Sequence, residues 1–340
     1  MEHMNEAVVA IHPDFSIAFY NRSFLEIFSP DYPVNEKSFF TDVVRSVPLS
    51  ELVRNVFFTR KTQKKIMEIA TPYVRSTHEV QAVQIPLKNE TLVALVFYDL
   101  TEIKESEKMK RDFITNASHQ LKTPLTAIQG YAETLIDDPK MDLGIRQDFL
   151  RKIKSKSTEV SDLVVKLLKL SKLESNAEKI QLSLLDVVKT IQDLEKKFEG
   201  NLKKHQIQLV HEFQSDEISL LTDVALFQLV IENLLENAIK YSKQGGKVFI
   251  KVVEVDENIQ LSIRDEGIGI PKQDQSRIFE RFFRSSNAEN HSHDGIGIGM
   301  ALVKSALEKM EGSIQIHSDQ NEGTEMILSF PKKVKVGNEG

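Results

Sequence analysis

A short run of amide, lysine and tyrosine side chains has the composition of a site for magnesium and phosphate. It spans residues 233–241, NLLENAIKY, and a helix would place Asn233, Asn237 and Lys240 or Tyr241 on one face. A carboxamide oxygen is a suitable hard ligand for Mg²⁺ that also holds phosphate oxygens. A lysine one turn away can meet a phosphate as a point charge. By itself, such a run is more often a solvated helix face.

Two glycine-rich segments follow it, at 265–271 (DEGIGIP) and 295–300 (GIGIGM). Glycine allows close approach of the backbone, and amides of a glycine run at a helix N-terminus can bind phosphate oxygens. Asp265 can accept the adenine amino proton, and guanine has no amino group at that position. An aromatic and basic turn, 278–284 (IFERFFR), lies between the segments, and Gly323-Thr324 follows them. The nucleotide-site candidates here are Gly267, Gly269, Ile270, Arg284, Gly295, Gly297, Gly299 and Thr324.

A histidine that could accept a phosphoryl group lies about a hundred residues upstream, in 113–125 (FITNASHQLKTPL). This stretch is expected to be helical, with an apolar stripe at positions 113, 117, 121, 125 and 128. His119 falls on the opposite side, beside Gln120 and one turn before Thr123. A lone surface histidine usually has no function, but a neutral imidazole at pH 7 has a free ring nitrogen.

Two long helices are expected to carry this histidine, from Ile103 to about Leu135 and from about Gly144 to Leu173. Pro124 should kink or loosen the first of them beside His119. Apolar residues at 160, 163, 167 and 170 have heptad spacing in the second. Helices with narrow apolar faces and a short connection form an antiparallel hairpin. A lone hairpin buries too little surface, so a homodimer with a four-helix bundle is predicted.

The two ends of the chain read as mixed helix and strand. Residues 180–332 are expected to form a mixed sheet with helices on one face. Its helices are predicted near 185–199, 224–242 and 299–311, and its strands near 207–213, 218–222, 247–255, 258–264, 313–318 and 325–330. Residues 5–100 are expected to form a smaller α/β domain, with strands at 7–11, 16–20, 79–85 and 91–98 and a helix capped by Asn21. His78, the one haem-ligand candidate in its later half, is expected at the surface.

Composition excludes several classes of protein. The 340 residues carry a net charge of −6, which argues against a nucleic-acid partner. Cysteine is absent, which excludes disulfides and thiol chemistry. No apolar run approaches the length of about 20 residues that a membrane-spanning helix needs. No signal peptide is visible either. The composition does not specify a compartment, but it is compatible with a reducing cytoplasm.

The order and spacing of these segments resemble sensor histidine kinases over residues 103–332. The stretch around His119 resembles the phosphoacceptor box. The runs at 233–241, 265–271, 278–284 and 295–300 resemble the asparagine box, the first glycine box, the phenylalanine box and the second glycine box, in family order. Residues 5–100 resemble a PAS sensor domain through the early hairpin, the asparagine-led helix and the tail at 98–102, YDLTE.

The resemblance implies a multidomain α+β architecture. Residues 1–102 would be a PAS-like domain, and residues 103–178 a dimerisation and histidine-phosphotransfer hairpin. Residues 179–340 would be an α/β sandwich ATP-binding domain of the gyrase, Hsp90 and histidine-kinase type. The chain would be a cytoplasmic protein or the cytoplasmic part of a membrane-anchored kinase.

The resemblance also implies the chemistry. ATP with Mg²⁺ would phosphorylate His119, and the phosphoryl group would pass to an aspartate of a response regulator. Asn237 would hold the metal and Asp265 would read adenine. Arg284 would reach the γ-phosphate, and residues 285–298 would form a lid. The residues expected near the phosphates are Asn233, Lys240 and Tyr241.

The chain departs from the family pattern beside the histidine. Gln120 stands where the family usually has Glu or Asp, and an amide cannot act as a base. Autophosphorylation is therefore expected to be slower than in the family. Thr123 corresponds to the position that supports removal of phosphate from the regulator by orienting a water. In the second glycine box, Ile296 and Ile298 replace the commoner Thr and Leu, but the glycines are kept.

Three other functions compete with that of an active kinase. The chain could be a signalling scaffold with a weakened kinase, or a homologue in which phosphatase activity dominates; Gln120 supports this alternative. An ATP-driven clamp like gyrase is disfavoured, because such proteins have a catalytic Glu where this chain has Asn233.

Overall fold

The computed structural model describes residues 6–28, 34, 38–71, 75–88, 90–175, 180–286 and 296–332. They belong to two compact units, residues 1–114 and 115–340. The domain boundaries at 102/103 and 178/179 stay predictions. None of the described helices is long and apolar enough to cross a membrane.

The first unit contains a five-stranded antiparallel sheet. Its order is β2-β1-β5-β4-β3, formed by β1 (Ala7–Ile11), β2 (Ile17–Tyr20), β3 (Gln63–Ala70), β4 (Arg75–Pro86) and β5 (Thr91–Asp99). The helices are α1 (Arg22–Phe28), α2 (Phe40–Val43) and α3 (Val47–Thr59). The strands predicted at 7–11, 16–20, 79–85 and 91–98 are confirmed, whereas β3 and α3 were missed. Phe24, Phe40 and Leu95 are fully buried in its core.

Asn21 caps α1, as predicted. Its Oδ1 accepts hydrogen bonds from the amides of Phe24 (3.1 Å) and Val8 (2.9 Å). One buried amide side chain therefore ends the β1–β2 hairpin and starts the helix.

His78 is buried, so its predicted surface position is wrong. Its residue is 2% exposed, and its ring lies edge-on to Phe97 with centroids 6.2 Å apart. Its Nδ1 lies 3.3 Å from Oγ of Ser76. In β4 alternate residues face the core, and His78 shares the inward face with Ser76 and Val80. Burial lowers the pKa of the His78 imidazole, and Asp99 opposes that shift.

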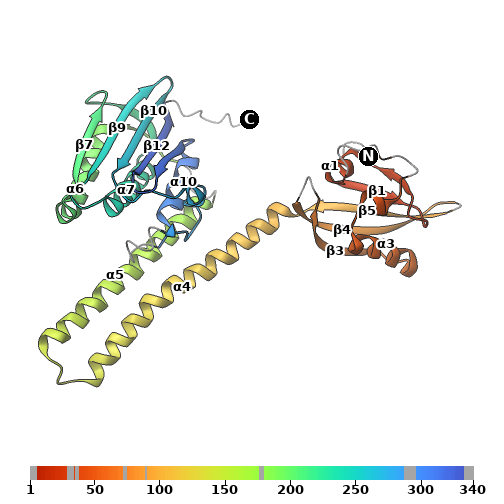
Figure 1. Ribbon diagram of the computed structural model, residues 1–340, viewed down its shortest axis with the longest axis horizontal. Helices are drawn as coiled ribbons and strands as arrows, with labels where there is room; N and C mark the ends of the chain where they lie inside the picture. The colour runs from red at the N-terminus through yellow and green to blue at the C-terminus, as the bar shows by residue number, and fades with distance from the viewer. Residues whose placement is uncertain are drawn as a thin grey trace. The chain divides into compact units, whose positions relative to one another are not determined.

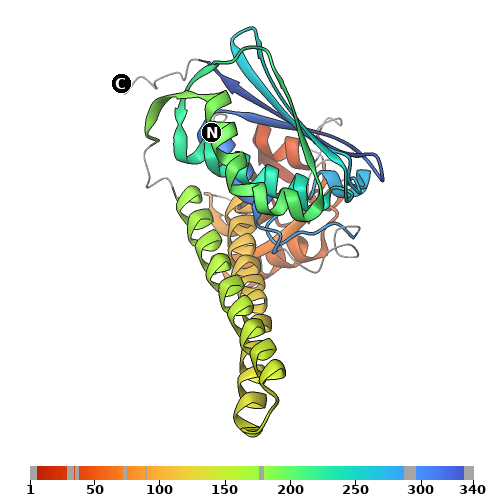
Figure 2. The same ribbon diagram turned by 90° about the vertical axis from the view of Figure 1, so that its left-hand side faces the viewer.

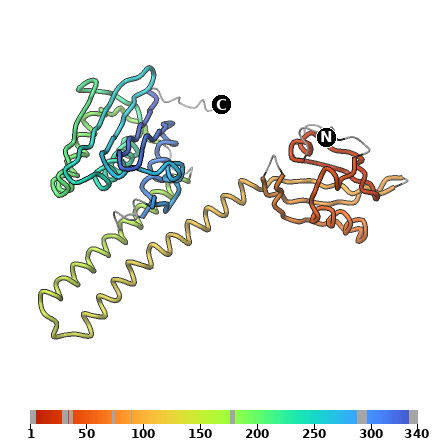
Figure 3. Tube along the Cα trace, in the orientation of Figure 1, coloured from red at the N-terminus to blue at the C-terminus, as the bar shows by residue number. Residues whose placement is uncertain are grey.

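The predicted helical hairpin is formed by α4 (Thr101–Asp137) and α5 (Leu143–Glu174), which run in opposite directions from a tight connection (Figure 3). Asp142 caps α5 by accepting from the amides of Gly144 and Ile145. α4 continues unbroken through Pro124. Pro124 itself is buried, whereas Leu125, predicted on the apolar stripe, is 46% exposed. The stripe therefore passes through position 124 instead of 125.

The C-terminal part is built on a mixed five-stranded sheet, as predicted, ordered β11-β12-β10-β9-β7. It contains β7 (Gln208–Phe213), β9 (Lys247–Val255), β10 (Asn258–Asp265), β11 (Ser313–Asp319) and β12 (Gly323–Pro331), and only the β7–β9 pair is parallel. The helices α6 (Val187–His205), α7 (Val224–Tyr241) and α10 (Gly299–Lys309) lie over one face (Figure 2). A short pair, β6 (Leu182–Asp186) and β8 (Ser219–Asp223), stands apart, and β6 was missed.

Part of the α5 heptad stripe is covered within one chain. Leu163 and Leu170 are 1% and 0% exposed, and α10 packs against α5 (Figure 1). These two positions therefore do not need a second copy to be buried.

Candidate functional site

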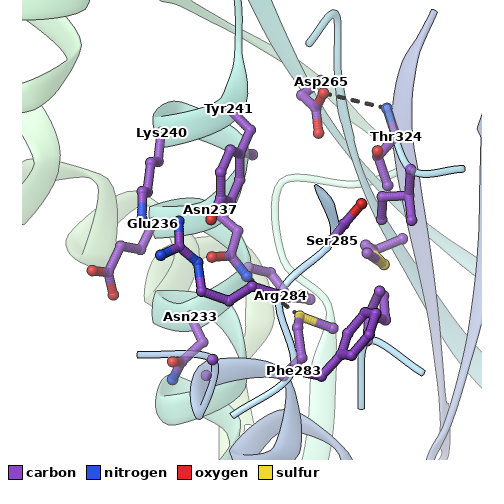
Figure 4. Close-up of a pocket in the computed structure, with 18 of the residues that line it drawn as sticks. Asn233, Glu236, Asn237, Lys240, Tyr241, Asp265, Phe283, Arg284, Ser285 and Thr324 are labelled. Atoms are coloured by element: carbon purple, nitrogen blue, oxygen red, sulfur yellow. Dashed lines mark hydrogen bonds between the residues drawn. The ribbon is translucent and has the colours of Figure 1, made fainter. Parts of the chain in front are cut away.

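A pocket opens between α7, the end of β10 and the start of α10 (Figure 4). Its described wall contains twenty residues from the C-terminal motifs together with Lys166 of α5, Ile263, Ser285 and Met326. The motif residues in its wall are Asn233, Leu234, Glu236, Asn237, Ala238, Lys240, Tyr241, Asp265, Ile268, Gly269, Ile270, Ile278, Phe283, Arg284, Ile296, Gly297, Ile298, Gly299, Met300 and Thr324. Segments that lie far apart in sequence thus meet in one cavity.

The helix α7 has one face in the core and one face toward the pocket. Asp223 caps its start by accepting from the amides of Ala225 (3.0 Å) and Leu226 (3.1 Å). Phe227 is fully buried, and its ring lies 5.4 Å from that of Phe330. This packing fixes the rotation of α7, which leaves the polar run at its C-terminal end facing the cavity.

The two asparagines of α7 have different surroundings. Asn233 is 7% exposed, and its amide donates to the Leu229 carbonyl at 2.7 Å. Its Oδ1 lies 2.9 Å from the place that a Cβ on Gly299 would occupy. Asn237 donates through Nδ2 to Sδ of Met300 at 3.3 Å. Because Met300 holds the amide nitrogen of Asn237, its Oδ1 is left as the atom for a ligand.

Asp265 ends β10 at the opposite end of the pocket. Its Oδ1 accepts from the amides of Gly267 (2.8 Å) and Thr324 (3.3 Å), and the residue is 8% exposed. Burial raises the pKa of the Asp265 carboxyl to about 6, and the two backbone amides oppose this shift. The carboxylate of Asp265 is therefore buried, and β10 and β12 together fix its orientation.

A serine that the sequence did not point to connects two of the predicted residues. Oγ of Ser318 accepts from the Ile270 amide (2.8 Å), donates to the Gly323 carbonyl (2.8 Å) and lies 2.9 Å from Oγ1 of Thr324. Gln275 adds two hydrogen bonds from its Nε2, to the carbonyls of Ile270 and Ser318. The first glycine segment is therefore tied to β11 by side chains.

Two glycines are required by the protein's own backbone. Gly269 has φ +64°, and a Cβ there would lie 2.0 Å from the Asp319 carbonyl oxygen. Gly297 has φ +74°, and its Cβ would lie 2.7 Å from the Phe283 carbonyl oxygen. The Gly297 carbonyl accepts from the Phe282 amide at 2.8 Å. The predicted close approach is present, but it joins protein segments to one another.

Charged and aromatic groups gather at the end of the pocket next to α7. Figure 4 shows Arg284 reaching across the cavity toward Asn237 and Glu236. Nζ of Lys240 lies 5.0 Å from the ring centroid of Tyr241. Burial is the main cause that raises the pKa of the Tyr241 phenol, while Arg284 lowers it and Glu236 raises it further.

Sequence reasoning missed several wall residues for different reasons. Glu236 lies inside the run at 233–241, so its place next to Asn237 could have been noticed in the sequence. Lys166 lies on the hairpin, 70 residues before Glu236, and nothing in the sequence connects the two. Ser285, which is also in the wall and follows Arg284, is 8% exposed and donates a buried hydrogen bond of 2.7 Å to Asp274 outside the described wall.

The phosphoacceptor histidine and the two predicted residues beside it are not in the pocket. His119, Gln120 and Thr123 are exposed on α4, and none of them is among the described residues of the pocket wall. Oγ1 of Thr123 donates to the His119 carbonyl at 3.3 Å. Gly295 and most of the predicted lid, residues 287–295, lie outside the described residues. Among the described side chains, no group of three or more His, Cys, Asp or Glu could hold a metal.

Two family models match this chain. Residues 109–176 match "His Kinase A (phospho-acceptor) domain", a range that contains His119. Residues 222–334 match "Histidine kinase-, DNA gyrase B-, and HSP90-like ATPase", a range that contains the pocket motifs from Asn233 to Thr324.

Curated relatives are sensor kinases. The chain is 31% identical over 248 residues to the sensor histidine kinase WalK of Bacillus subtilis (strain 168), covering 72% of this chain and 40% of WalK. It is 34% identical over 237 residues to the sensor-like histidine kinase SenX3 of Mycolicibacterium smegmatis, covering 69% of this chain and 60% of SenX3. The chain thus spans about half the length of these relatives.

Solved structures agree with the fold. The Acinetobacter baumannii histidine kinase AdeS is 25% identical with a TM-score of 0.52, over 64% of this chain and 98% of AdeS. The histidine kinase ThkA, solved in complex with response regulator protein TrrA, is 16% identical with a TM-score of 0.54, over 96% of both chains, and it supports the fold alone. With both family models in the expected order, the chain belongs to the sensor histidine kinases of two-component systems.

Proposed function

We propose that this chain binds ATP, transfers its γ-phosphoryl group to His119, and then passes the group to an aspartate of a response regulator. The observation that carries the proposal is the pocket itself. It combines a buried carboxylate, Asp265, at one end with an amide ligand and cations, Asn237, Lys240 and Arg284, at the other.

The carboxylate end fits adenine. Ile263, Ile278 and Met326 provide apolar surface for the flat base. Asp265 is a buried acceptor that the amino group of adenine would satisfy, which offsets part of the cost of a buried charge. Guanine presents a carbonyl oxygen at that position, and two acceptors facing each other would be unfavourable. The pocket therefore favours adenine nucleotides.

The other end fits phosphates and a magnesium ion. Arg284 and Lys240 supply positive charge, and α10 has no side-chain cap at its N-terminus, so its first amides can meet phosphate oxygens. Asn237 offers its Oδ1 as the one protein ligand, which suits Mg²⁺ because this ion is usually held by few protein groups together with phosphates. When bound, Mg²⁺ would neutralise charge on the phosphate oxygens.

His119 would act as the nucleophile. A ring nitrogen attacks the γ-phosphorus in line, so that an N–P bond forms, the bond to the bridging oxygen breaks and ADP leaves. Arg284 and Lys240 would balance the charge of the transferring group. The pocket wall does not include His119, so the reaction requires the α/β part and α4 to approach each other.

Gln120 and Thr123 would set the balance between the kinase activity and the removal of phosphate from the regulator. Gln120 can orient the imidazole by a hydrogen bond but cannot take its proton. Thr123 would orient a water for removal of phosphate from the regulator, which requires its hydroxyl to turn from the His119 carbonyl. We therefore propose a kinase that also has phosphatase activity.

The proposals for the sensor domain, the homodimer and the location also rest on the resemblance to sensor histidine kinases. The first unit is proposed to be a PAS sensor domain, supported by the Asn21-capped hairpin and by Asp99, which accepts from the Thr101 amide at 2.8 Å where α4 begins. A homodimer is proposed because Leu150, Leu168 and other apolar side chains of the hairpin remain half-exposed in one chain. The proposed location is the cytoplasm, as a whole protein or as part of an anchored one, without a nucleic-acid partner.

Incubation of the full chain with γ-labelled ATP tests the proposal. We expect acid-labile label on the wild-type protein and none on His119→Ala. His119→Ala should still bind ATP, because position 119 lies outside the pocket. Absence of label on a wild-type protein that binds ATP would instead support the scaffold alternative.

A further inference from the structure

The pocket is not built by the α/β part alone. Lys166, on the second helix of the hairpin, lines the pocket together with Glu236 of α7. Nζ of Lys166 lies 3.5 Å from Oε2 of Glu236. A cation of the hairpin therefore faces an acidic side chain that directly precedes Asn237.

The charge of Glu236 acts inside the pocket. Glu236 contributes to the raised pKa of Tyr241, after the larger effect of burial, whereas Arg284 opposes it. Figure 4 shows Glu236 on the same side of the cavity as Asn237 and Lys240. A nucleoside triphosphate would bring several negative charges to this region. A carboxylate without a partner would repel them.

We propose that Lys166 is a positioning residue that makes affinity for polyphosphate nucleotides depend on docking of α5 onto the α/β part. By pairing with Glu236, Lys166 offsets the acidic charge that Glu236 places next to the proposed phosphate end. The inference rests on the proposed ATP function, and it adds the hairpin helix to the site. The binding of a nucleoside such as adenosine, which carries no phosphate, would not depend on this charge.

Other contacts hold α5 in place without touching Glu236. Arg281 and Glu174 form an ion pair of 2.6 Å, and Nζ of Lys309 donates to the Ser175 carbonyl at 3.3 Å. Leu170 is fully buried. When α5 leaves this position, Lys166 leaves the pocket with it. Since linkage is reciprocal, a nucleotide that binds the docked form better must stabilise docking by the same factor.

Calorimetric titration of the full chain with ATP, ADP and adenosine, each in the presence of Mg²⁺, tests the inference. Lys166→Ala should weaken ATP binding about three- to tenfold, ADP binding less, and adenosine binding not at all. The effect should shrink at high salt, because Lys166 and Glu236 are partly exposed to solvent. Lys169→Ala is the matched control, since Lys169 lies on the same helix, is exposed and is outside the pocket wall.

A second variant isolates the pair. Glu236→Gln in the Lys166→Ala background should restore most of the ATP affinity, because the repulsive charge is removed. Unchanged ATP affinity in Lys166→Ala would overturn the inference, and so would an equal loss for adenosine, which would show that Lys166 merely shapes the pocket. A wild-type chain that fails to bind ATP at all would instead reject the proposed function.

Discussion

Asp265 and Thr324 meet across the β10–β12 pair, where the Thr324 amide donates to Oδ1 of Asp265 at 3.3 Å. Together with the Gly267 amide, this bond aims a carboxylate that is almost fully buried. The two donors do not offset its desolvation, since the pKa of Asp265 is raised to about 6. The site therefore stores an unfavourable charge that a ligand's amino group can relieve.

This raised pKa predicts how stability depends on pH. Between the usual pKa of an aspartate, near 3.8, and the folded value of about 6, the native state binds more protons than the unfolded state. The Asp265 contribution to the free energy of unfolding therefore falls as pH rises through this window, by about 2–3 kcal/mol in total.

Asp265→Asn removes the titration but can still accept both backbone hydrogen bonds. The difference in free energy of unfolding between the variant and the wild-type chain should therefore grow in favour of the variant from pH 4 to pH 6.5. Denaturant titrations across this range measure it. A difference that is independent of pH would show that the carboxyl is not desolvated as the structure indicates.

Gly269 and Gly245 form a matched pair for testing backbone strain. Both have positive φ, +64° and +77°, but an added Cβ meets the Asp319 carbonyl oxygen at 2.0 Å only at Gly269, and nothing within 4 Å at Gly245. Gly245→Ala should cost about 1 kcal/mol of stability from φ alone. Gly269→Ala should cost clearly more, about 2–4 kcal/mol, because the backbone must move. Equal losses in denaturant unfolding would contradict the clash.

The sequence predicted the elements of the C-terminal part well because each signal there was local. Asp223 followed by an apolar run indicates the start of α7, and the spacing of Asn233 and Asn237 indicates its polar face. Glycine spacing likewise located two backbone approaches. These patterns depend on neighbours within one or two turns, which a sequence displays directly.

The features that were missed depend on long-range packing. His78 is buried because the face of β4 that carries it is turned toward Phe97. A histidine alone does not reveal on which face of a strand it lies. Lys166 joins the pocket only because α5 packs against α10. Pro124, and not Leu125, lies on the apolar stripe of α4. Steps of three and of four residues are both compatible with such a stripe, so the sequence alone did not decide between them.

Gln120 predicts a slow autokinase that one substitution should accelerate. Gln120→Glu places a carboxylate beside His119, where it can accept the proton of the other ring nitrogen as the first one attacks phosphorus. We expect the initial rate of His119 labelling from γ-labelled ATP to rise about tenfold, with ATP affinity unchanged because position 120 lies outside the pocket. The double variant His119→Ala, Gln120→Glu should carry no label. An unchanged or lower rate would count against a base at this position.

Thr123 predicts a separable phosphatase activity. Its hydroxyl lies one turn beyond His119 on the exposed side of α4, where in the proposed reaction it orients the water that attacks the regulator's phosphoaspartate. Thr123→Ala removes this hydroxyl and should slow dephosphorylation of the regulator about tenfold or more, while His119 labelling stays within about twofold. Thr123→Ser keeps the hydroxyl and should retain most of the phosphatase activity.

The loss of the Thr123 side-chain bond to the His119 carbonyl affects only one exposed contact, so helix stability should change little and can be checked by thermal unfolding. Loss of both activities in Thr123→Ala would point to a disturbed helix, whereas full phosphatase activity with a normal kinase would reject the role of the hydroxyl.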